Sequence, residues 1–261
     1  MEPAAVAALF AQTLLGEYHG DEAWNAVQAL RRAGDRNIFE HAAAWCLSDD
    51  PLKRARAADV LCQLRRANGT EDPDWMFRDE AYSLLTKMLE DEMDQLVLNS
   101  VIHALGHLGI AGAVPLILRY RDHPSEDIRF AATFALGCFP NHPQSVDGLL
   151  KLSSDAEADV RDWAVFGLGV LGDADSPEIR EALLRCLDDT SANVREEAAV
   201  GLGKRRDPRV VPHLWTMLNQ PEPGDRAAEA TAALLGLDQY PEAWNAAEFR
   251  RALAARFPSL G

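Results

Sequence analysis

Two histidines are spaced as a pair of metal ligands on one helix would be. His103 and His107 lie four residues apart, and residues at that spacing share one face of a helix. The catalytic zinc motif has a Glu directly after the first His, whereas Ala104 occupies that position here. Asp59 and Cys138 could supply further ligands. The pair therefore fits either a metal or chromophore site or two solvated histidines; we favour the second interpretation and expect no bound metal.

The other reactive residue types form no catalytic arrangement. The sequence contains no Gly-rich phosphate loop, no nucleophile elbow and no paired acid–base motif. Its four cysteines, Cys46, Cys62, Cys138 and Cys186, stand in separate apolar runs and form no Cys-x-x-Cys pair. We expect them to be reduced and buried, as in a cytoplasmic protein. The sequence therefore predicts a protein without a cofactor and without enzymatic activity.

The charge of the chain disfavours two kinds of partner. The 261 residues contain 41 Asp and Glu against 26 Lys and Arg, a formal charge of −15. A negative field repels phosphate backbones, which makes nucleic acid an unfavourable partner. No apolar stretch is long enough for a membrane helix, and residues 4–15 lack the basic lead of a secretion signal. Most of the excess acidity falls in residues 71–94 and 147–189, which indicates either a basic protein partner or a solvated acidic face.

The elements that position these residues repeat along the chain. Residues 160–169 and 194–203 are identical at six of ten positions, and weaker copies occur upstream. The repeated leucines are 30, 61, 105, 136, 168, 202 and 235, and the last copy can be read in two registers. Their spacing gives one period of about 32 residues through nearly the whole chain.

Each period contains two helical patterns. Between the repeated segments, apolar residues follow i, i+3, i+4 spacing, as in Ile179, Leu183, Leu184 and Leu187. Prolines separate the patterns or open them. An alanine column precedes the leucines by one turn and lets neighbouring helices approach closely; its members are Ala57, Ala132, Ala164 and Ala198. We therefore expect an all-α fold of stacked helix pairs with no β-rich segment.

These repeats resemble HEAT repeats, specifically the short bacterial form also seen in phycobilin-lyase-like proteins. The motif is an Asp six residues before an Arg, followed by Ala and Leu-Gly, and the resemblance covers residues 21–237. Full matches are Asp155 with Arg161 and Asp189 with Arg195, whereas Arg54 and Arg129 lack the Asp. The resemblance implies a right-handed α-α superhelix of about six to seven helix pairs, with the second helices lining a concave surface. It also implies scaffolding or protein recognition rather than catalysis.

The Asp and Arg of the motif have a structural interpretation. An Arg at a helix start is poorly placed for the helix dipole, whereas a nearby carboxylate can accept its forked donors and bridge adjacent repeats. We therefore assign the structural role to Arg54, Arg129, Arg161, Arg195, Asp155 and Asp189. The missing acids predict a weaker ladder at Arg54 and Arg129.

The repeat pattern predicts one domain over residues 1–261. Residues 1–20 and 238–261 are expected to form capping helices around the repeats at 21–237. One spacing of 44 residues between repeated leucines indicates an inserted polar loop near 67–76, which contains Trp75. Such a loop either contacts a partner or is a tolerated surface excursion.

The second-helix columns that face the concave side combine aromatic and charged residues. Aromatic side chains gather in the middle of the array, at Phe130, Phe134, Trp163 and Phe166. Arg56, Asp59 and His103 flank them on one side, and Asp162, Glu196 and Glu197 on the other. An aromatic centre with a charged rim is typical of a protein-binding hot spot, although the same rings could simply fill gaps between helices.

Known HEAT-like enzymes match the sequence less well. A di-iron hydroxylase family carries His-Glu pairs where this chain has Asp162-Trp163 and Glu196-Glu197. A family that excises alkylated bases from DNA needs a basic groove, and the basic clusters here, at 31–32, 65–66 and 204–206, could equally cap helix ends. A lyase subunit with a site around His103 and His107 rests on fold analogy. We therefore expect a non-catalytic scaffold or adaptor that binds a protein or peptide, with such an enzyme or lyase subunit as the alternative.

Overall fold

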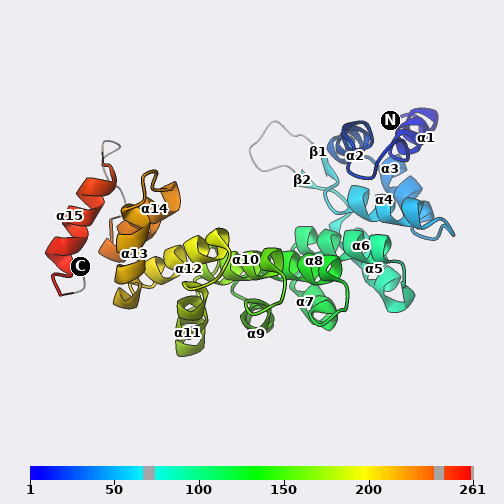
Figure 1. Ribbon diagram of the computed structural model, residues 1–261. Helices are drawn as coiled ribbons and strands as arrows, with labels where there is room; N and C mark the ends of the chain where they lie inside the picture. Colours follow the sequence, from blue (N-terminus) through cyan, green and yellow to red (C-terminus); the bar gives the residue numbers. More distant parts are fainter. Residues whose placement is uncertain (67–73, 238–243, 260–261) are drawn as a thin grey trace. The chain divides into compact units, whose positions relative to one another are not determined.

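The computed structural model describes residues 1–66, 74–237 and 244–259, and it consists of helix pairs (Figure 1). Two compact units are present, Met1–Cys138 and Phe139–Gly261. The first contains α1 (Pro3–Gln12), α2 (Asp21–Ala33), α3 (Arg36–Trp45), α4 (Pro51–Leu61), β1 (Arg65–Arg66), β2 (Asp74–Trp75), α5 (Arg78–Asp91), α6 (Gln95–Leu108), η1 (Ala111–Ala113), α7 (Val114–Ile117), η2 (Leu118–Tyr120) and α8 (Glu126–Gly137). The second contains α9 (Pro143–Leu152), α10 (Ala158–Phe166), the π-helical turn η3 (Gly167–Leu171), α11 (Pro177–Cys186), α12 (Ala192–Lys204), η4 (Pro208–Val210), α13 (Val211–Leu218), α14 (Asp225–Leu235) and α15 (Ala246–Arg256).

Short polar signals begin or end several of these helices. The carboxylate of Asp94 accepts hydrogen bonds from the first free N–H groups of α6, and Ser176 caps α11 in the same way. Asn245 and Glu248 form a reciprocal capping box at the start of α15. Gly109 ends α6 with a positive φ of 62°, a conformation that costs a glycine little. At these positions, local sequence is enough to set where the helix begins or ends.

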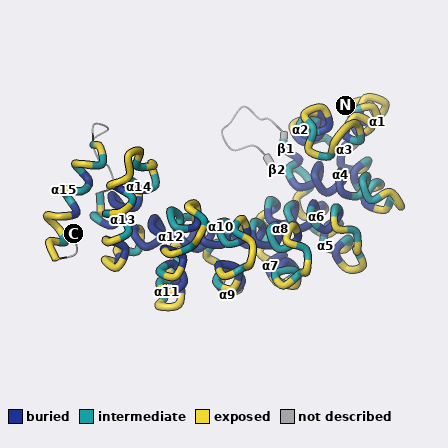
Figure 2. Tube along the Cα trace, in the orientation of Figure 1, coloured by how far each residue is buried: buried dark blue, intermediate teal, exposed yellow. Residues whose placement is uncertain are grey.

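The second helices of consecutive pairs stack on one another. In the first unit α2, α4, α6 and α8 are in sequential contact, and in the second unit α10, α12 and α14 are. The repeated residues lie at these contacts, where the alanine column is fully buried and the leucines from 30 to 202 are 0–2% exposed. Figure 2 shows buried stretches along these helices, for example in α4 and α12. The predicted all-α repeat fold is confirmed. In the last copy, whose register the sequence left open, Leu234 is buried whereas Leu235 is half-buried, so Leu234 takes the place of the buried leucine.

Some glycines of the second helices mark close approaches between helices. A Cβ placed on Gly201 of α12 would lie 2.6 Å from the Cα of Gly169 and 3.0 Å from a methyl carbon of Leu183. In the first unit, a Cβ on Gly106 of α6 would lie 2.8 Å from the Cα of Ala135 on α8. No side chain fits between these backbones, so the glycines set how tightly the repeats stack.

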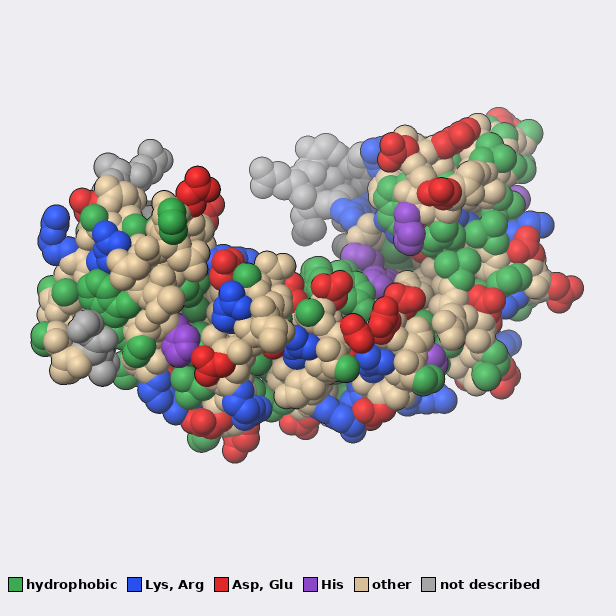
Figure 3. Space-filling view, in the orientation of Figure 1, with side chains coloured by type: hydrophobic (Ala, Val, Ile, Leu, Met, Phe, Trp, Pro, Cys, Tyr) green, Lys and Arg blue, Asp and Glu red, His purple; other side chains and the backbone are tan. Residues whose placement is uncertain are grey.

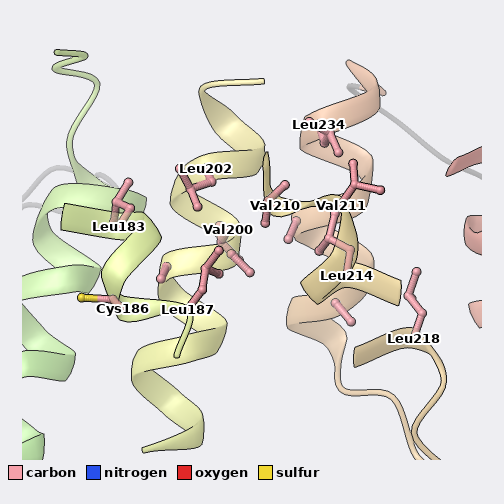
Figure 4. Close-up of a cluster of buried hydrophobic side chains, with 14 of the residues drawn as sticks. Leu183, Cys186, Leu187, Val200, Leu202, Val210, Val211, Leu214, Leu218 and Leu234 are labelled. Atoms are coloured by element: carbon pink, nitrogen blue, oxygen red, sulfur yellow. The ribbon is translucent and has the colours of Figure 1, made fainter. Parts of the chain in front are cut away.

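The core of the second unit is continuous across its helix pairs. Leu183 from α11, Leu202 from α12 and Leu214 from α13 belong to one cluster of buried side chains, together with Leu234 from α14 (Figure 4). Cys186 lies at the edge of this cluster, as expected of a small apolar residue. Cys46 and Cys62 are also buried, but the expectation of burial is wrong for Cys138, which is exposed just after the end of α8.

The Arg–Asp ladder is offset by one repeat. Arg161 donates one Nη to the backbone carbonyls of Asp155 and Ala156, and its other nitrogens donate to both carboxylate oxygens of Asp189 at 2.7 and 2.9 Å. Asp189 also accepts the N–H of Ser191 in its own turn. The Arg therefore closes the turn that precedes it and grips the carboxylate of the next repeat.

One link of the ladder uses a carboxylate that is not part of the Asp–Arg motif. Arg54 donates to the backbone carbonyls of Ser48 and Asp49 and binds both oxygens of Glu92 at 2.8 and 3.0 Å. The prediction of a weaker ladder at Arg54 is therefore wrong, because a Glu from the next helix pair supplies the carboxylate. Arg129 and Arg195 likewise donate to carbonyls of their preceding turns.

We expect a measurable coupling energy between Arg161 and Asp189. Both side chains are mostly buried, at 14% and 11% exposure, so a double-mutant cycle with Arg161→Met and Asp189→Asn should give about 1–2 kcal/mol at pH 7. Arg161 lowers the pKa of Asp189, so this stabilisation is present above the unfolded-state pKa and is lost as the pH falls through the folded-state pKa. Urea unfolding provides the measurement. The exposed pair Arg209 and Glu181 is the control and should couple less; equal coupling would contradict the argument.

One element departs from the helical expectation. Arg65 pairs with Trp75 and Arg66 with Asp74 in a two-residue antiparallel ladder, and the N–H of Met76 donates to the carbonyl of Leu64. This pairing brings together the two ends of the predicted inserted loop. Residues 67–73 and the side chain of Trp75 lie outside the described part of the structure, so the predicted role of Trp75 is not addressed.

Two further expectations concern the whole chain. The single domain over 1–261 stays a prediction. The predicted caps correspond to α1, which packs on α2, and to α15, which packs on α13 and α14. Within the described ranges, no helix is both long and apolar enough to cross a membrane.

Candidate functional site

The second unit carries an acidic–aromatic face, which we define as Asp162, Trp163 and Phe166 of α10 with Glu196 and Glu197 of α12. These positions follow from the helical period. Val160, Ala164, Val165 and Leu168 are buried in the core, whereas Asp162, Trp163 and Phe166 lie on the less buried side of the same helix. All five side chains of the face are half-buried. The rings of Trp163 and Phe166 meet edge to face, with centroids 5.5 Å apart.

The carboxylates of this face lie in an unfavourable environment. One oxygen each of Asp162 and Glu197 is buried without a hydrogen-bond partner among the described residues. Desolvation raises the pKa of Asp162, and it raises that of Glu197 to about 7, where Asp162 adds repulsion and Arg226 opposes it. Arg226 of α14 donates to the other oxygen of Glu197 at 2.7 Å and to Glu229 at 2.7 Å. Arg226 is therefore shared by Glu197 and Glu229. A further cation that binds nearby would lower the free-energy cost of keeping these carboxylates ionised.

The first unit contains the other two predicted aromatic residues and the histidine pair. His103 stacks on Phe134 with centroids 4.8 Å apart, His107 meets Phe134 edge to face at 5.1 Å, and Phe130 lies 6.3 Å from His103. Figure 3 shows histidine side chains gathered on one face of this unit. The four predicted aromatic residues are thus divided between the two units. All four are half-buried, between the exposed patch and the core filler that the sequence left open.

The histidines are neutral aromatic groups here. Burial lowers the pKa of His103, and burial together with the positive charge of Arg31 lowers that of His107 to about 4. Nδ1 of His103 lies 3.1 Å from the carbonyl of Asn99, which can only accept; the ring proton is therefore on Nδ1, and Nε2 is an acceptor. Nδ1 of His107 lies 3.3 Å from the amide of Gln63. Among the described residues, no three His, Cys, Asp or Glu side chains form a group that could hold a metal ion.

The expectation that Arg56 and Asp59 form an exposed rim is wrong. Arg56 is 1% exposed; it donates to the carbonyls of Thr13 and Tyr18 and lies 3.2 Å from the carboxylate of Asp59. The hydroxyl of Tyr18 donates to the same carboxylate at 2.6 Å and meets Ser100 at 2.7 Å. The segment after α1 therefore covers this part of α4. Tyr18 was missed because it lies outside the repeats and no spacing rule marks it.

Two arginines of the basic clusters, Arg205 and Arg31, donate to backbone carbonyls near helix ends. Arg205, 5% exposed, donates to the carbonyls of Leu168, Gly169, Gly172, Ala174 and Gly201. Arg31, 6% exposed, donates to the carbonyl of Asp59, to Gln63 and to the sulfur of Cys62. Arg205 and Arg31 therefore perform the capping role, one of the two that the sequence left open.

The repeat geometry agrees with a family match. HEAT repeats are recognised over residues 27–137, 82–169 and 146–235, which together span most of the chain. The chain belongs to the HEAT-repeat family. Within each unit the second helices of these repeats stack on one another, and the predicted aromatic residues lie on them. No curated protein sequence matches the chain well enough to add a relative.

Solved structures share the fold at low sequence identity. The Escherichia coli protein YibA is 21% identical, with a TM-score of 0.71 over 95% of this chain and 90% of that chain. A designed armadillo repeat protein in complex with the peptide (KR)4 is 18% identical, with a TM-score of 0.51 over 89% and 99%. Human deoxyhypusine hydroxylase is 19% identical over 99% and 91%, but its TM-score of 0.39 is too low to support an argument. These similarities establish the repeat fold alone.

Proposed function

We propose that this HEAT-repeat protein is a non-catalytic scaffold that binds a basic protein or peptide segment on its acidic–aromatic face. The observation that carries the proposal is the pair of half-buried acids, Asp162 and Glu197, beside the rings of Trp163 and Phe166; each acid has one buried oxygen that no described residue contacts by a hydrogen bond. Aromatic anchors with charged neighbours are the usual composition of an interaction hot spot. The proposal keeps Trp163 and Phe166 as anchors and Glu196 as a flanking acid.

The chemistry of the face fits Lys and Arg side chains. Their aliphatic stems can pack on Trp163 and Phe166, and a guanidinium can also stack on an aromatic ring. Their charged ends then lie near Asp162 and Glu197, where Arg226 is the nearby cation already in place. Peptide binding by the designed armadillo protein, with its (KR)4 ligand, supports the proposal as a precedent for a fold of stacked helices.

Binding of a Lys–Arg octapeptide by the full chain tests the proposal. At about 0.15 M salt, where exposed charges are screened, we expect calorimetry to detect binding that weakens about tenfold or more in Asp162→Asn/Glu197→Gln and in Trp163→Ala/Phe166→Ala. The matched control is Asp147→Asn/Glu178→Gln, which removes the same charge from exposed positions on α9 and α11. Equal weakening in the control, or no binding by the unaltered chain, would contradict the proposal.

The pH dependence adds an independent readout. Glu197 has a pKa of about 7, so it is mostly protonated at pH 6 and mostly ionised at pH 8. A basic peptide prefers the ionised form, and we therefore expect affinity to rise between these pH values with release of a proton. Glu197→Gln should flatten this rise. An affinity that falls as the pH rises, or a rise of the same size in Glu197→Gln, would show that Glu197 is not part of the binding site.

A further inference from the structure

The first unit contains a cavity of about 370 Å³ that the proposed function does not use. Its wall includes Trp24 from α2, Asp59 from α4, His103 and His107 from α6, and Phe134 from α8. We call it the aromatic cavity. The rings of His103 and Phe134 stack with centroids 4.8 Å apart and form a continuous aromatic part of this wall.

The polar groups of the aromatic cavity are arranged for a ligand without positive charge. Asp59 is the one acidic side chain among the described residues of its wall, and its carboxylate is bound by Arg56 and Tyr18. Both histidines are neutral, and Nε2 of His103 can accept a hydrogen bond. The cavity therefore offers ring surfaces and an acceptor, with little attraction for a cation.

A second cavity of about 150 Å³ adjoins the first and is strongly basic. It is lined by Gln28, Arg31, Arg32, Gln63 and Arg65, and we call it the arginine cavity. Arg31 lines both cavities. Arg31 and Arg32 bring two positive charges to this cavity, in a chain of formal charge −15.

Arg31 is a pre-positioned donor between the two cavities. Its Nε donates to the carbonyl of Asp59 at 2.7 Å, Nη1 to Gln63 and Nη2 to Cys62, and its guanidinium lies 5.0 Å from the ring centroid of Trp24. A guanidinium has five N–H donors, so two remain after these contacts. The group is held in place before any ligand arrives, which reduces the entropy cost of binding an anion.

We propose that the two cavities together bind a small aromatic phosphate monoester. Its ring enters the aromatic cavity against His103 and Phe134, and its phosphate enters the arginine cavity, where Arg31 and Arg32 donate to it. A phosphate monoester suits the site because it carries about two negative charges at pH 7 and several acceptor oxygens, which match a cluster of arginines. This site is independent of the acidic–aromatic face, which lies in the other unit.

Calorimetric titration of the full chain with 1-naphthyl phosphate tests the proposal. We expect binding that is about tenfold or more tighter than that of 1-naphthol, which lacks the phosphate, and of inorganic phosphate, which lacks the ring. Equal affinity for inorganic phosphate would leave a simple anion site and overturn the proposal. Equal affinity for 1-naphthol would overturn the role of the arginine cavity.

Two variants examine the two halves of the site separately. Arg32 is exposed, so Arg32→Gln should leave the fold intact and weaken 1-naphthyl phosphate by about fivefold or more. Phe134→Leu keeps an apolar side chain but removes the stacked ring, and it should weaken the same ligand by about tenfold. Arg119→Gln, an exposed arginine of η2, is the charge-matched control and should change affinity less than about twofold. Thermal unfolding of each variant verifies the fold, and equal affinity in all three folded variants would overturn the proposal.

Discussion

Replacement of Arg205 by Met is expected to lower the free energy of unfolding of the second unit by about 3 kcal/mol or more. The guanidinium donates to five backbone carbonyls where η3, the following turn and α12 meet, with distances from 2.6 to 3.3 Å. η3 is a π-helical turn, and its end leaves carbonyls without helical partners. Met fills part of the volume but donates nothing, so these buried acceptors lose their partner.

Two comparisons isolate the role of the guanidinium fork. Arg205→Lys keeps the charge but has a compact ammonium that reaches fewer carbonyls. Its free energy of unfolding should therefore fall between those of Arg205→Met and the unaltered protein. Arg185→Met removes an exposed arginine on α11 and should change the free energy of unfolding by less than about 0.5 kcal/mol. Urea unfolding followed by circular dichroism measures all four proteins. A loss at Arg205 no larger than that at Arg185 would refute the capping argument.

Gly201→Ala is expected to destabilise the second unit by about 2–3 kcal/mol although alanine is the better helix former. The added Cβ would lie 2.6 Å from the Cα of Gly169, a backbone atom that moves only if the two repeats separate. Leu183 closes the same space from α11, at 3.0 Å. The cost is therefore steric and is shared by α12 and the repeat before it.

A helical glycine in open space provides the opposite expectation. A Cβ on Gly137 of α8 would meet no atom within 4 Å, so Gly137→Ala should leave stability unchanged or raise it by up to about 1 kcal/mol. The two substitutions make the same chemical change in helices of one chain. Effects of the same sign and size in urea unfolding would show that close packing against Gly169 is not what makes glycine necessary at position 201.

The sequence by itself determined the repeat architecture. Helix pairs, their breakpoints and the buried leucine and alanine columns depend on period and composition, which are local properties of the chain. The same reasoning placed Asp162, Trp163, Glu196 and Glu197 on one set of neighbouring columns. It also gave the paired Asp and Arg of the motif a bridging role between repeats, although it did not show which Arg meets which Asp.

Only the tertiary structure decided the partners of these residues. The carboxylate for Arg54 comes from Glu92, thirty-eight positions away, and Arg161 binds the Asp of the following repeat. Tyr18, outside every repeat, buries Arg56 and Asp59. Such contacts depend on how closely one helix pair approaches the next and on where a non-repetitive segment packs. A periodic sequence sets which side of a helix a residue occupies, whereas the distance between helices, fixed by packing at residues such as Gly201, sets what that residue meets.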